Sequence, residues 1–128
     1  MNVRNLCLGA ALLVMSIGNA LAADRFPYDA KAFAEALAAG RPILVHITAP
    51  WCAQCKAQKP IVAVLAARPE YAALTIFDVD FDTQKDALRD LKVQKQSTLV
   101  IYTGKAEAAR AVGITRPEAI EALMRKAL

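Results

Sequence analysis

The sequence predicts an α/β domain in which a central mixed β-sheet is covered by helices on both faces. Two apolar runs, at residues 43–47 and 74–80, have the length and the β-branched content of buried strands. Segments with helical spacing of apolar residues alternate with these runs, and a hairpin pattern follows at 98–112. Elements in this order pack as one sheet between two layers of helices.

The first 22 residues have the pattern of an export signal. Arg4 provides a short positive region, and residues 6–17 form an apolar run without charge. Ala20 and Ala22 place small residues where a signal peptidase cleaves, and the run is shorter than the ~20 residues of a spanning helix. We expect a cleaved signal peptide at 1–22, one domain at 23–128 and a periplasmic location. The alternative is an uncleaved membrane anchor.

The first helix of the domain is expected at residues 30–39. Asp29 is suited to cap its N-terminus, and Gly40 ends it. Phe33 and Leu37 have the i, i+4 spacing of one helix face.

A second helix is expected from the Cys52-Ala53-Gln54-Cys55 segment to about residue 67. Pro60 lies inside it, and an interior proline removes a hydrogen bond and bends the axis, so we expect a kink there. The residues expected on its inward face are Ile61, Val64 and Leu65.

The second half of the domain completes the sheet. The elements expected there are a strand at 74–80, a helix at 83–91 and a hairpin of strands at 98–102 and 108–112 around Gly104. Leu88 and Leu91 are expected to point inward. Pro117 suits the first turn of a last helix, and its buried face is expected to carry Ile120, Leu123, Met124 and Ala127.

Charge and cysteine content exclude two classes of protein. Loss of Arg4 with the signal lowers the formal net charge from +4 to +3, and the basic residues are scattered singly among acidic ones. No basic stripe lies beside aromatics, so we expect no nucleic-acid partner. The domain keeps two cysteines, Cys52 and Cys55, and the loop between them is too short to brace a disulfide scaffold.

The spacing of Cys52 and Cys55 suits thiol–disulfide exchange, in which one thiolate attacks and a second thiol resolves the mixed disulfide. At a helix N-terminus, free N–H groups and the helix dipole favour a negative charge on Cys52 and lower its pKa. We expect Cys52 to be the exposed nucleophile and Cys55 the shielded resolving thiol, without cofactor or metal. The alternative is a module that binds or delivers a metal, although zinc needs four ligands and only His46 and carboxylates accompany the two cysteines.

The segment Trp51-Cys52-Ala53-Gln54-Cys55-Lys56, followed by Pro60, resembles the W-C-x-x-C-K motif and helix proline of the thioredoxin family. Val79-Asp80, Gly104 and Val112-Gly113 match the family's strand end, hairpin turn and Val-Gly before the last helix. The resemblance implies a thioredoxin-like α/β/α sandwich, a dithiol–disulfide cycle on protein cysteines, and a hydrophobic groove around Trp51 that receives the substrate.

Three positions depart from the family pattern. His46 stands where the family has a buried aspartate, and Ile76 stands where it often has a lysine. We expect His46 to accept the proton of Cys55; the alternative is a core histidine that only packs. Ser97 replaces the family's cis-proline, so we expect a trans Gln96–Ser97 bond and a Ser97 hydroxyl that binds the Cys52 thiolate or a substrate backbone.

The sequence favours a reductant over an oxidant. The dipeptide between the cysteines, Ala53-Gln54, lacks the histidine common in strong oxidants that resemble this family. Dithiols outside the cytosol are oxidised by default, so a reductant there needs electrons from a separate membrane protein. We expect protein thiols and disulfides as substrates and a soluble, monomeric mature form.

Overall fold

The computed structural model describes residues 22–128, so the predicted signal peptide lies outside the described residues except for Ala22. The strands are β1 (Asp24–Pro27), β2 (Ile43–Thr48), β3 (Thr75–Asp80), β4 (Thr98–Thr103) and β5 (Ala106–Val112). The helices are α1 (Ala30–Ala38), α2 (Ala53–Ala66), α3 (Lys85–Asp90) and α4 (Pro117–Met124), with short 3-10 turns at Pro69–Tyr71 and Arg125–Ala127. None of the helices within 22–128 is long and apolar enough to cross a membrane.

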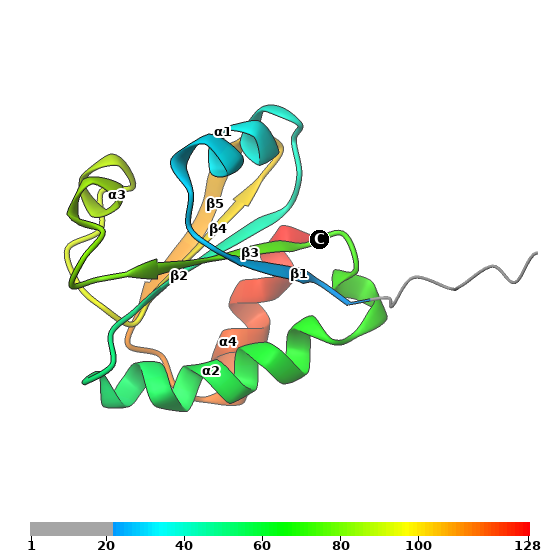
Figure 1. Ribbon diagram of the computed structural model, residues 1–128. Helices are drawn as coiled ribbons and strands as arrows, with labels where there is room; N and C mark the ends of the chain where they lie inside the picture. The colour runs from blue at the N-terminus through cyan, green and yellow to red at the C-terminus, as the bar shows by residue number, and fades with distance from the viewer. Residues whose placement is uncertain (1–21) are drawn as a thin grey trace, which may run out of the picture.

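The five strands form one mixed sheet in the order β1-β3-β2-β4-β5. The central strand β2 runs parallel to β3 and antiparallel to β4, while β1 and β5 form the edges. Figure 1 shows α1 and α3 on one face of the sheet and α2 and α4 on the other. The predicted α/β/α sandwich is confirmed.

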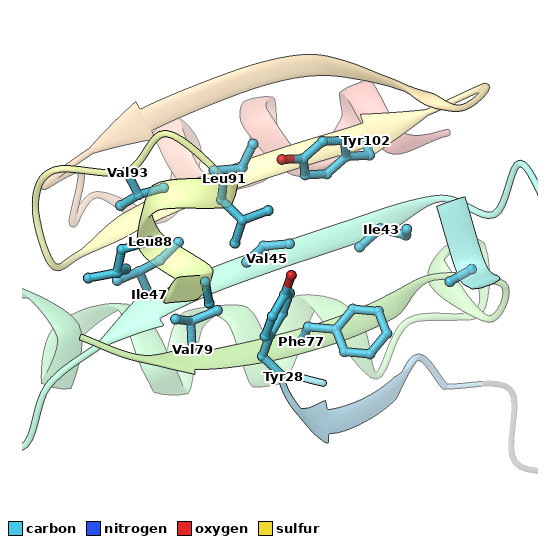
Figure 2. Packing of buried hydrophobic residues seen from close by; sticks show 13 residues of the cluster. Tyr28, Ile43, Val45, Ile47, Phe77, Val79, Leu88, Leu91, Val93 and Tyr102 are labelled. Atoms are coloured by element: carbon cyan, nitrogen blue, oxygen red, sulfur yellow. The ribbon is translucent and has the colours of Figure 1, made fainter. Parts of the chain in front are cut away.

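Alternate residues of the central strands point into two separate cores. Figure 2 shows Ile43, Val45 and Ile47 of β2 on the face that α1 and α3 cover, where the predicted inward residues Leu88 and Leu91 are also buried. Leu44 points to the opposite core, under α2 and α4. The buried residues contributed by the C-terminal segment are Ile120, Leu123, Met124 and Ala127, as predicted. His46 follows Leu44 by two positions and therefore faces α2.

Strand β1 is absent from the sequence-based prediction. It contains Asp24, Arg25 and Pro27, and all four of its residues are exposed or half-buried, so it has no apolar alternation to reveal it. Backbone pairing with β3 in parallel register forms this edge of the sheet.

The predicted inward face of α2 is partly wrong. Val64 is 65% exposed, whereas Val62 is buried together with Leu65. Cys55 and Gln58 lie on the same buried stripe as Val62 and Leu65. Successive residues of this stripe are three or four positions apart, as the helical period requires, so position 64 falls outside it. The kink at Pro60 stays a prediction.

Candidate active site

The two cysteines meet at the N-terminus of α2. Cys52 is the N-cap residue, and its Sγ atom accepts a hydrogen bond from the Cys55 backbone N–H at 3.1 Å. The two side chains form a disulfide across a Cα–Cα distance of 5.3 Å. In the reduced protein, the same N–H and the positive end of the helix dipole stabilise a thiolate on Cys52. The predicted pairing of Cys52 and Cys55 is confirmed.

The cysteines are less accessible than the sequence suggests. Cys52 is 3% exposed and Cys55 is fully buried, so the expectation of an exposed nucleophile is wrong in degree. Ala49 and Phe81 pack against the pair and explain the low exposure of Cys52. The Cys55 Sγ atom lies 3.9 Å from the Ile47 carbonyl oxygen, beneath the helix end. Cys52 is still the more exposed of the two cysteines, which suits it to attack.

Trp51 lies on the surface beside the disulfide. Its indole is 58% exposed, and Nε1 donates to both carboxylate oxygens of Asp82 at 3.0 and 3.1 Å. The ring meets Phe81 edge-on at a centroid distance of 6.3 Å. Phe81 and Asp82, which follow β3, hold the exposed indole in place. Sequence reasoning missed both because they lie far from Trp51 along the chain.

Ser97 lies next to the dipeptide between the cysteines. All peptide bonds within the described range are trans, so the prediction for Gln96–Ser97 is confirmed. Ser97 has φ of 55° and is almost fully buried. Its hydroxyl donates to Gln54 Oε1 at 3.0 Å, so Gln54 rather than a cysteine sulfur is its partner. Contact of Ser97 with a substrate stays a prediction.

His46 is fully buried and has partners at both ring nitrogens. Nε2 lies 3.0 Å from Gln58 Oε1, and Nδ1 lies 3.4 Å from the Arg25 guanidinium. Arg25 also forms a bidentate ion pair with Asp78 at 2.6 and 2.7 Å. Burial lowers the pKa of His46 to about 4, although the Gln58 hydrogen bond and the Asp78 charge act in the opposite direction. The imidazole is therefore neutral near neutral pH.

The structure does not join His46 to the cysteines. In the described part of the chain, neither His46 nitrogen hydrogen-bonds to Cys52 or Cys55. The role of His46 as proton acceptor for Cys55 stays a prediction. A neutral imidazole has the protonation state that such a role requires, but the structure shows a different set of partners.

Residues 25–126 match the family model for thioredoxin. The chain belongs to the thioredoxin family. It is 31% identical to the thioredoxin of Chlamydia trachomatis over 94 residues, which are 73% of this chain and 89% of that protein. It is also 32% identical over 85 residues to the bifunctional thioredoxin reductase/thioredoxin of Mycobacterium leprae, but spans only 18% of that protein. The crystal structure of Trxlp from Edwardsiella tarda is 42% identical, covers 78% of this chain and 98% of its own, and has a TM-score of 0.76.

Family membership and the Cys52–Cys55 pair identify the protein as a thiol–disulfide oxidoreductase. If the pair acts in the reducing direction with the roles predicted from the sequence, the Cys52 thiolate attacks a sulfur of a protein disulfide, forms a mixed disulfide and displaces one substrate thiolate, which takes up a proton. Cys55 then loses its proton and attacks Cys52 Sγ, which releases the second substrate thiolate. In that direction two electrons pass to the substrate and the Cys52–Cys55 disulfide forms; the oxidising direction runs the same steps in reverse.

The metal-binding alternative has no support in the structure. Between residues 22 and 128, no three His, Cys, Asp or Glu side chains are grouped in a way that would hold a metal ion. The one histidine of the chain faces Gln58 and Arg25 rather than the two sulfurs.

Proposed function

We propose that this thioredoxin family member is exported to the periplasm and there reduces disulfides of other proteins. Support for export comes from the positive, apolar and small-residue regions of residues 1–22. Support for the direction comes from the surroundings of Cys52. We also propose that the mature protein is a soluble monomer.

The proposed reducing direction rests on the small number of groups that stabilise a Cys52 thiolate. Its Sγ atom accepts one backbone hydrogen bond, from Cys55 N–H. No lysine, arginine or histidine side chain in residues 22–128 hydrogen-bonds to it. Strong oxidants of this chemistry are oxidising because their reduced form is highly stabilised. A dithiol with little such stabilisation gives up its electrons more readily.

A reductant outside the cytosol must be reduced again after each turnover. Each cycle leaves the Cys52–Cys55 disulfide, and the compartment itself favours that oxidised form. We therefore propose a membrane protein that carries electrons across the membrane and delivers them to Cys52–Cys55 by the same exchange chemistry.

Alkylation of free thiols in intact cells tests this proposal. We expect the exported protein to begin at Ala23 and to be isolated mostly with Cys52 and Cys55 reduced. The expected N-terminus is read by mass spectrometry of the alkylated chain. A product that retains Met1 contradicts cleavage, and a chain found mostly as the disulfide contradicts the reductant role. A Cys52→Ser, Cys55→Ser double variant controls for alkylation elsewhere.

A further inference from the structure

The buried face of α2 carries one polar side chain, Gln58, which has no solvent exposure. Its Nε2 amide donates to the carbonyl oxygens of Ser97 at 3.0 Å and Ile114 at 2.9 Å. Its Oε1 faces His46 Nε2 at 3.0 Å. A buried amide is costly unless its donors and acceptor are paired, and here both donors and the acceptor are.

The two carbonyls belong to the loops that flank the disulfide. Ser97 lies immediately before β4, and Ile114 lies between β5 and α4. The loops contact each other, since the Ser97 carbonyl also accepts from Gly113 N–H at 2.9 Å. Both loops also touch Gln54, the residue before Cys55: Ser97 donates to its Oε1, and a Cβ atom at Gly113 would lie 3.0 Å from its Nε2. A protein substrate that approaches Cys52 therefore meets the surface that these loops form.

The two carbonyls also determine which way the amide points. Only the NH2 group of Gln58 can donate to Ser97 and Ile114, so the carbonyl oxygen must face His46. That oxygen accepts a hydrogen bond, which places the proton of the neutral imidazole on Nε2. The bare Nδ1 then faces the Arg25 guanidinium. A continuous series of contacts thus leads from the half-buried Arg25–Asp78 ion pair through His46 to Gln58, and from Gln58 to the two active-site loops.

We propose that Gln58 is a positioning residue for thiol–disulfide exchange and that its amide, oriented by the two loop carbonyls, holds the proton of His46 on Nε2. Gln58 holds the Ser97 and Ile114 loops against α2, so that the surface beside Cys52 is already formed when a protein substrate arrives. A preformed surface binds more tightly because fewer loop conformations are lost on binding. The proposal rests on the oxidoreductase activity alone and is independent of export and of the direction of electron flow.

Kinetics of Gln58→Met test the proposal, because methionine keeps the length of the side chain and removes its hydrogen bonds. We expect KM for a protein disulfide such as insulin to rise about tenfold, with kcat nearly unchanged, since the two hydrogen bonds that hold the loops are lost. The rate with a small aromatic disulfide, which meets little of the loop surface, should stay close to that of the parent. Val62→Ala is the matched control: it removes packing from the same buried stripe and should leave KM unchanged.

A parental KM in folded Gln58→Met overturns the proposal, as does an equal rise in Val62→Ala. Inactivity of the parent enzyme would instead contradict the oxidoreductase function. The second measurement needs neither activity nor a variant that folds. His46 is the one histidine of the chain, so its two nitrogen NMR signals are unambiguous. We expect the tautomer protonated at Nε2 near neutral pH; a proton on Nδ1 contradicts the amide orientation and overturns the proposal.

Discussion

Replacement of Cys52 by serine is expected to abolish disulfide exchange, whereas replacement of Cys55 is expected to leave the protein attached to its substrates. A serine hydroxyl is not ionised near neutral pH, so Cys52→Ser lacks the attacking group, and the rate should fall at least ~1,000-fold. Cys55→Ser still attacks through Cys52 but cannot resolve the mixed disulfide. The position of Cys52 at the N-cap and of Cys55 beneath it gives this division of roles its physical basis.

Non-reducing electrophoresis after incubation with a disulfide-bonded protein measures both outcomes. Cys55→Ser should accumulate mixed-disulfide adducts that a reducing agent cleaves, and Cys52→Ser should accumulate none. The Cys52→Ser, Cys55→Ser double variant controls for adducts through other contacts. If each single variant still turned over its substrate, the redox assignment of the pair would be wrong.

The free energy of unfolding is expected to fall by about 3 kcal/mol as the pH drops from about 6.5 to about 4, because of His46 alone. Burial holds the pKa of His46 at about 4 in the folded protein, below the ~6.5 of an imidazole in the unfolded chain. Between these two values the unfolded chain binds a proton that the folded protein does not, and this stabilises the unfolded state. The contribution of the neutral, buried His46 to the free energy of unfolding is therefore fully present above pH ~6.5 and is lost as the pH falls towards the folded-state pKa of about 4.

Urea denaturation across this pH range measures the effect. His46→Gln keeps a polar side chain facing Gln58 but does not titrate, and the carboxylates that titrate in the same window are common to both proteins. The difference between parent and variant therefore isolates His46. Parallel stability curves would show that the imidazole is not buried as the structure has it.

The core of the fold was predictable because its central strands carry their own signal. The run at Ile43–Thr48 is too apolar for any place but a sheet covered on both faces, and the spacing from Pro117 to Met124 marks a one-sided helix. Strand β1 carries no such signal, since Arg25 and Pro27 are unusual in buried strands and backbone pairing with β3 defines it.

The site was predictable where its chemistry is local in sequence and not where it depends on distant contacts. Cys52 and Cys55 are three residues apart, and the helix between them explains their roles. The role of Gln58 depends on its hydrogen bonds to Ser97 and Ile114, which lie 39 and 56 residues further along the chain. A single glutamine inside a helix gives no sequence pattern that would indicate those bonds. Replacement of the family's aspartate by His46 was visible in the sequence. Its partner Arg25, however, lies on the strand that the sequence did not predict.

The equilibrium of the Cys52–Cys55 couple with glutathione tests the proposed reductant role most directly. Fractions of dithiol and disulfide, measured across a series of glutathione ratios, give the reduction potential. We expect a value near that of thioredoxin, about −270 mV, because little besides the helix N-terminus stabilises the Cys52 thiolate. A reduction potential above about −180 mV, in the range of disulfide isomerases and oxidants, would contradict the reductant role.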